Sequence, residues 1–255
     1  MNLTQLQSKI NNAKDLDFGT IFNQSMELFK KVWVQGLLTL IISGAMMIPF
    51  YFLMYLPLIA IGLIDPESFE PGNDPNFMIM FPFFIFLILF VFYVMVVSFG
   101  MQAAFFRICM QKDLNIVASD DYFHFFKKRN IPKILKLSLA STVISVLAIF
   151  LCFLPFIYVI VPLMFFPIMF AFNPDLSATE IIKASFTLGN KKWLITFGLL
   201  FVSIILAYIV GFMMCLVGIY VTAYFVYLPA YHIYKDVIGF EDTNEINHIG
   251  DKPEF

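Results

Sequence analysis

The segment WLITFGLLFVSIILAYIVGFMMCLVGIYVTAYFVYLPAY, residues 193–231, decides the fold class because it runs for 39 residues without Asp, Glu, Lys, Arg or His. Three further uncharged runs cover residues 32–64, 75–106 and 137–174. A membrane-spanning helix needs about 20 apolar residues at a rise of about 1.5 Å each. The first two runs therefore fit one span each, and the last two fit two spans each if the chain turns midway.

The composition of the whole chain agrees with these runs. Of its 255 residues, 60% are hydrophobic and only 13% are charged, whereas a soluble domain carries about 25% charged residues. One soluble core of this size cannot hide so many apolar side chains, so many of them must face lipid. The sequence predicts an all-α, polytopic membrane protein.

The basic residues decide the number of spans. Cytoplasmic segments of membrane proteins are rich in Lys and Arg. A six-span topology makes residues 1–31, 107–136, 175–192 and 235–255 cytoplasmic, and these four segments hold all 16 Lys and Arg residues. The segment 65–74 carries four acids and no base, as an exterior loop can. A four-span topology would place 175–192, with its three lysines, outside. We therefore expect six spans with both termini in the cytoplasm.

An internal repeat supports the same number. Residues 21–33 (IFNQSMELFKKVW) and 181–193 (IIKASFTLGNKKW) share Ile, Ser, Leu, Lys and Trp at a constant offset, and they contain the only two tryptophans. Trp prefers the headgroup level and Lys marks the cytoplasmic side, so both copies should begin spans from the same side. A weaker third copy covers residues 122–129. The pattern predicts three helical hairpins, each introduced by a short amphipathic helix.

The introducing segments allow two interpretations. Residues 20–33 and 178–193 place apolar side chains on one side at helical spacing, and Ser177 with Glu180 forms the pattern of a capping box. Such helices can lie in the membrane interface. They can equally be cytoplasmic extensions of the spans, packed on their neighbours.

We place the spans at residues 34–60, 77–103, 134–153, 156–172, 194–212 and 217–232, with turns at 152–155 and 211–218, where Pro and Gly interrupt the apolar runs. Residues 1–18 are predicted to be a cytoplasmic N-terminal segment, 19–237 the membrane domain, and 238–255 a disordered acidic tail. Six prolines within the spans indicate ordinary kinks or, alternatively, broken helices around a transport site. Ten side chains are predicted to anchor the protein at the cytoplasmic interface: Lys30, Lys31, Trp33, Lys127, Lys128, Arg129, Lys191, Lys192, Trp193 and Lys235.

Candidate catalytic groups occur only at the ends of the spans. No ionisable residue lies near a span centre, where its cost of about 2.5–3.5 kcal/mol is usually tolerated only for function. Asp120, Asp121 and His124 would share part of a helix face, and His232 ends the last span. Three or four ligands are needed for a metal site, and no accompanying motif supplies them. We therefore expect no catalytic residue, cofactor or metal.

The chain resembles a group of uncharacterised bacterial six-helix membrane proteins similar to the membrane domain of glycerophosphoryl diester phosphodiesterases. The features that carry this resemblance are Phe18–Phe22, the block from Ser25 to Trp33, its copy at Ser185–Trp193, and Pro229–Tyr231. The resemblance covers residues 16–240 and none of the soluble catalytic domain, so it implies no activity. It implies a bacterial cytoplasmic membrane and a helper or scaffold role.

Three functions are compatible with the sequence. The first is a non-enzymatic protein that organises lipid or a partner protein. The second is a transporter or channel for a neutral or lipidic solute, which the prolines favour. The third is a lipid-headgroup enzyme that uses Asp120, Asp121, His124 or His232. The predicted partners are the bilayer and a membrane protein or second copy of the chain, but not nucleic acid.

Overall fold

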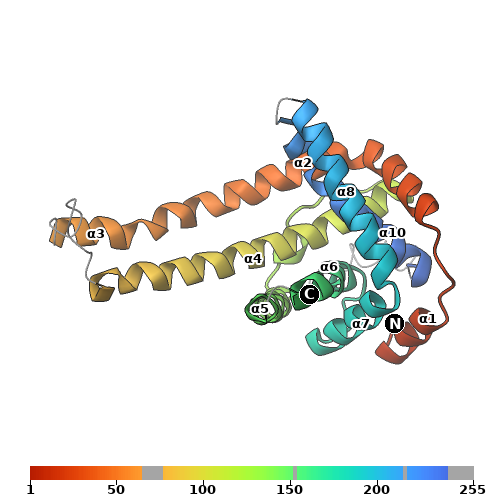
Figure 1. Cartoon of the computed structure of the whole chain (residues 1–255), viewed down its shortest axis with the longest axis horizontal. Helices are drawn as coiled ribbons and strands as arrows, with labels where there is room; N and C mark the ends of the chain where they lie inside the picture. The colour runs from red at the N-terminus through yellow and green to blue at the C-terminus, as the bar shows by residue number, and fades with distance from the viewer. Residues whose placement is uncertain (65–76, 152–153, 215–216, 241–255) are drawn as a thin grey trace, which may run out of the picture.

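The computed structural model describes residues 1–64, 77–151, 154–214 and 217–240, and in these residues the chain is helical and contains no strand (Figure 1). The first half of the chain forms α1 (Leu3–Asn11), α2 (Phe18–Met54), α3 (Leu56–Ile64) and α4 (Phe77–Asp113). The second half forms the 3₁₀ helix η2 (His124–Phe126), α5 (Ile131–Phe150), α6 (Leu154–Phe172), α7 (Ala178–Lys191), α8 (Trp193–Met213), α9 (Val217–Thr222), the 3₁₀ helix η3 (Ala223–Tyr227) and α10 (Leu228–Val237).

Within the described residues, five helices are long and apolar enough to cross a membrane: α2, α4, α5, α6 and α8. The prediction of an all-helical, multi-pass membrane protein is therefore confirmed. The end of α8 at Met213 falls within the turn predicted at 211–218, whereas α5 ends at Phe150, shortly before the turn predicted at 152–155.

The segment expected to form the sixth span, residues 217–232, is helical but does not form one α-helix. Six residues of α9 are followed by five residues in the tighter 3₁₀ conformation of η3, and α10 then begins with Pro229 as its second residue. Proline has no N–H to donate and clashes with the carbonyl four residues earlier. The backbone therefore tightens before Pro229, and the N–H of Leu228 bonds to the carbonyl of Phe225.

Other prolines have different effects. Pro49, Pro82, Pro162 and Pro167 lie inside continuous helices. Pro57 is the second residue of α3, directly after the break at Tyr55 that ends α2. The predicted first span is consequently two helices rather than one.

The long helices pack in pairs. α2 lies along α4 and continues into α3 at its far end, α5 packs on α6, and α8 packs on α9 and η3. The outer part of the α2–α4 pair is joined by aromatic contacts: the rings of Phe50 and Tyr93 stack at 4.9 Å, and the Tyr93 hydroxyl donates to the carbonyl of Met46. In Figure 1, α2 and α4 run across the view while α5 is seen close to end-on, so the pairs diverge from one another.

One core joins all the pairs, and it lies at the ends that carry the basic residues. Its members come from α1, the first half of α2, the last third of α4, η2, the start of α5, the later part of α6, α7, the first turns of α8, η3 and α10. The outer halves of α2 and α4 are instead exposed, with large apolar side chains such as Phe52 and Ile88 at their surface. Exposed apolar side chains of this number belong against lipid rather than water.

The two copies of the sequence pattern have the same buried side but different backbones. Ile21, Ser25 and Leu28 are buried in α2, and their counterparts Ile181, Ser185 and Leu188 are buried in α7. The first copy continues straight into the apolar part of α2, as an extension of the span. The second copy is a separate helix, since the backbone breaks at Lys192 before α8. The third copy holds only the 3₁₀ turn η2.

Two end segments contribute more to the packing than their composition indicates. Residues 1–18, predicted as a segment apart from the membrane domain, contain α1, which packs on α7 and buries Leu6 and Ile10 in the common core. At the other end, Ile238 is buried and Phe240 packs against Tyr231. The rest of the predicted disordered tail, residues 241–255, lies outside the described residues.

Candidate functional site

Seven of the ten predicted interface anchors are exposed at the protein surface. Lys30, Lys31 and Trp33 project from α2, Lys127, Lys128 and Arg129 follow η2, and Lys191 ends α7. Lys30 forms an ion pair with Glu27 at 2.6 Å, but both side chains are mostly exposed, so this pair contributes little to stability. These side chains are free to meet lipid headgroups.

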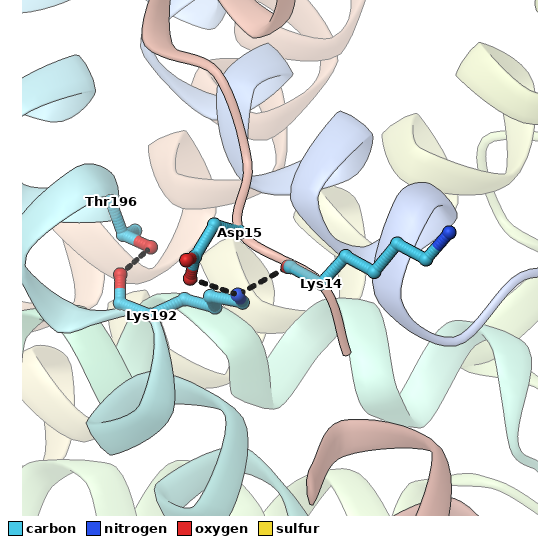
Figure 2. Close-up of polar contacts among 4 residues, drawn as sticks. All are labelled: Lys14, Asp15, Lys192 and Thr196. Atoms are coloured by element: carbon cyan, nitrogen blue, oxygen red, sulfur yellow. Dashed lines mark hydrogen bonds and ion pairs between the residues drawn. The ribbon is translucent and has the colours of Figure 1, made fainter. Parts of the chain in front are cut away.

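The other three anchors make contacts within the protein, and one of them, Lys192, is buried. Trp193 donates its indole N–H to the carbonyl of Tyr158 at 3.0 Å and stacks on Phe197. Lys192 is only 5% exposed, and its ammonium donates to the carbonyl of Lys14 at 2.6 Å, with the carboxylate of Asp15 at 3.9 Å (Figure 2). Lys192 thereby ties the linker between α1 and α2 to the corner between α7 and α8.

The third held anchor, Lys235, belongs to a polar cluster that sequence reasoning did not find. Its ammonium donates to the carboxylate of Asp113 at 2.6 Å, and the hydroxyl of Tyr231 donates to the same carboxylate at 2.8 Å. Next to it, buried Asn173 donates to the hydroxyl of Tyr234 at 2.9 Å. These contacts join α10 to the ends of α4 and α6. No local signal marks them, because the partners lie 61 to 122 residues apart.

The structure separates the residues considered for catalysis. Asp120 turns to the ammonium of Lys112 at 3.0 Å and the amide of Gln35 at 3.2 Å. Asp121 instead faces His124, with the imidazole Nδ1 at 3.5 Å from its carboxylate. His232 is buried in α10 against the ring of Tyr231. The described residues contain no group of three or more His, Cys, Asp or Glu side chains that could hold a metal ion.

His124 is held in its neutral form. Its partial burial, helped by the nearby positive charge of Arg107, lowers the pKa of the imidazole to about 4, although Asp121 acts in the opposite direction. A neutral imidazole beside a carboxylate is a possible arrangement for general base chemistry. Neither residue lines the two hollows described below.

A hollow of about 410 Å³ does open at the end of α10. Its walls are the linker after α1 and the residues that follow α10, and its charged members are Lys9, Lys14, Lys235 and Asp236. A neighbouring hollow of about 530 Å³ lies along α1 and shares Lys9.

No family model, curated protein or solved structure matches this chain.

The geometry thus contains two kinds of polar group. Internal ion pairs and hydrogen bonds fix α10, the α1–α2 linker and the α7–α8 corner, and they hold helices rather than reacting groups. Exposed basic side chains and the lysine-lined hollow remain open to a ligand, and both favour anions.

Proposed function

We propose that this chain is a six-span protein of a bacterial cytoplasmic membrane that binds and organises lipids, or a partner protein, without catalysing a reaction. One observation carries the proposal: the described Lys and Arg residues lie in the core-side halves of the long helices, in α1, α7 or α10, or in the segments that connect them, while the outer halves of the long helices carry none. Such a division suits a basic face toward anionic headgroups and apolar helices within the bilayer.

The direction of the helices supports six spans arranged as three hairpins. The core takes the beginning of α2 and the end of α4, the beginning of α5 and the end of α6, and the first turns of α8 together with α10. Each pair therefore leaves the core and returns to it. The sixth span is then the composite of α9, η3 and α10, whose last part is buried in the protein.

A common bilayer orientation requires the outer halves of the three hairpins to align. In the arrangement of Figure 1 they diverge, and their outer halves add few residues to the core. Alignment would require the hairpins to reorient relative to one another. The chain would then bend at the helix ends in the core, between α7 and α8 at Lys192 and between η2 and α5.

A non-enzymatic role is supported by the ionisable groups themselves. Asp113, Asp120 and Lys235 are engaged in internal ion pairs, and Asp121 and His124 form only a pair. The resemblance to the phosphodiesterase membrane domain agrees with a helper role and stays a prediction.

The topology is tested by labelling single cysteines from either side of sealed vesicles, in a chain whose three native cysteines are replaced by serine. Six spans make Lys183→Cys cytoplasmic, whereas four spans make it exterior. Lys128→Cys and Asp74→Cys are the controls, because both topologies place the first inside and the second outside. Labelling of Lys183→Cys from outside would overturn the six-span proposal.

The lipid-binding role is tested in nanodiscs that contain phosphatidylcholine and phosphatidylglycerol. We expect the protein to retain phosphatidylglycerol selectively through purification, as measured by lipid mass spectrometry. A variant with Gln at 127, 128 and 129 should lose about half of this enrichment or more, since each basic residue near a charged surface contributes about 1 kcal/mol. Equal retention of both lipids by the unaltered protein would contradict the proposal, and solute flux in proteoliposomes would favour the transporter alternative.

A further inference from the structure

The hollow at the end of α10 has the charge and size of a site for a small anion. It has a volume of about 410 Å³ and is lined by three lysines and one acid, Asp236, and one of the lysines, Lys235, is also paired with Asp113. Ala13, Leu16, Val237 and Ile238 add an apolar part to its wall. A ligand that fits it would have one strongly anionic group and a short carbon skeleton.

Two of its lysines are positioned by the protein. Lys9 donates to the carbonyl of Ile238 at 2.8 Å, and Lys235 donates to Asp113 at 2.6 Å. Each ammonium has three N–H donors, so each keeps donors for a ligand after its internal contact. Lys9 also covers a free carbonyl at the end of α10, where the helix dipole would otherwise repel an anion.

The third lysine, Lys14, is positioned through its backbone. The buried ammonium of Lys192 binds the carbonyl of Lys14 at 2.6 Å, and Lys192 is itself fixed where its own carbonyl accepts from Thr196 at 2.7 Å. Figure 2 shows the Lys14 side chain extending away from Asp15 and Lys192, and Lys14 lines the hollow together with Lys9 and Lys235.

We propose that this hollow binds a phosphate group carried on a small organic skeleton, such as glycerol phosphate. Three ammonium groups offer more donors than the two oxygens of a carboxylate can accept, and lysine binds phosphate as a point charge. The source of the phosphate is a lipid headgroup of the cytoplasmic leaflet or a soluble phosphate ester. The first of these sources rests on the lipid-binding role proposed above.

The test is titration of the full-length protein, in nanodiscs of phosphatidylcholine alone, with glycerol 3-phosphate and with inorganic phosphate, followed by calorimetry at low salt. Lys14→Gln is the decisive variant, because the Lys14 ammonium makes no described contact within the protein. We expect it to weaken binding about tenfold, the effect of one charge-assisted hydrogen bond. Lys183→Gln, which removes an exposed lysine on α7, should bind as the unaltered protein does.

Lys192→Met tests the positioning of Lys14. Lys192 does not line the hollow, so its replacement can act on the ligand only through the position of Lys14. The variant should weaken glycerol 3-phosphate binding, while thermal unfolding of the rest of the protein stays cooperative. Binding by Lys14→Gln as tight as that of the unaltered protein would overturn the site. So would equal weakening by Lys183→Gln, which would mean that only general surface charge is involved.

The source is identified by repeating the titration with phosphatidylglycerol in the nanodiscs. Competition that weakens glycerol 3-phosphate binding to the unaltered protein, but not to Lys14→Gln, supports a lipid headgroup. Unchanged binding supports a soluble ester. If the protein binds neither glycerol 3-phosphate nor phosphatidylglycerol at this hollow, the proposed site is wrong. The lipid retention tested with the variant at 127–129 is a separate measurement and would be unaffected by that result.

Discussion

The carboxylate of Asp113, at the last residue of α4, holds the ammonium of Lys235 on α10 at 2.6 Å and also accepts the hydroxyl of Tyr231. The side chains of Asp113 and Lys235 are only 17% and 33% exposed. This pair therefore fixes α10, most of whose residues are buried, to the end of α4, which is as long as α2.

Asp113→Asn should lower the free energy of unfolding by about 2 kcal/mol. Loss of one partner from a buried pair costs about 3–5 kcal/mol, and the partial exposure of Lys235 reduces that figure. Thermal unfolding in detergent measures the change, with Asp236→Asn as the control. The double variant with Lys235→Met should recover part of the loss, because it removes the unpaired charge. Unfolding of Asp113→Asn at the unaltered temperature would contradict this assignment.

Gly189→Ala should separate α7 from α6. A Cβ atom on Gly189 would lie 2.7 Å from the Cα of Pro162 and 2.9 Å from its Cγ, and the backbone atom cannot move without shifting the helix. We expect a loss of about 1–3 kcal/mol, typical of overpacking. Gly44→Ala is the matched control, since nothing lies within 4 Å of its added Cβ, and it should be neutral or stabilising. Thermal unfolding that ranks the two variants alike would count against the packing of α6 on α7.

Lys192→Met should release the linker between α1 and α2. The hydrogen bond from Lys192 to the carbonyl of Lys14 is shielded from water, and a bond to a charged donor contributes about 1.5–3 kcal/mol. Cleavage after Lys14 by a lysine-specific protease should become at least about tenfold faster, because such cleavage follows the population of the open linker. Mass spectrometry of the fragments measures it. Lys191→Met is the control. Because Lys191 is exposed, its replacement should leave the cleavage rate after Lys14 unchanged.

His124 should make the protein less stable in mild acid. Its pKa is lowered to about 4, mainly by burial, whereas the ordinary value is 6.5. Between these values the unfolded chain binds a proton that the folded chain rejects, so stability is complete above about pH 6.5 and falls as the pH decreases toward 4. Thermal unfolding at pH 7.5 and pH 5 should therefore show a smaller decrease for His124→Gln than for the unaltered protein. A decrease of the same size in both would exclude His124 as its source.

Much of the architecture follows from local patterns in the sequence. Lipid forces each backbone amide to bond within its own segment, so the uncharged runs had to be helical. The capping box of Ser177 and Glu180 is confirmed, with the Glu180 carboxylate accepting from the Ser177 N–H at 2.8 Å. The apolar spacing in residues 20–33 likewise predicted a buried face, and Ile21, Leu28 and Val32 are buried, although Trp33 is exposed. Each of these depends on residues within one or two turns of each other.

Only the tertiary structure decided which polar side chains face the interior. Lys191 and Lys192 are indistinguishable in sequence, yet the first is exposed and the second is buried against the N-terminal linker. Asp113 and Lys235 are 122 residues apart and meet only because the packing of α10 on α2, α6 and α8 brings it to the end of α4. Helix crossing sets such contacts, and it depends on side-chain packing along whole helices rather than on the pattern of any single segment.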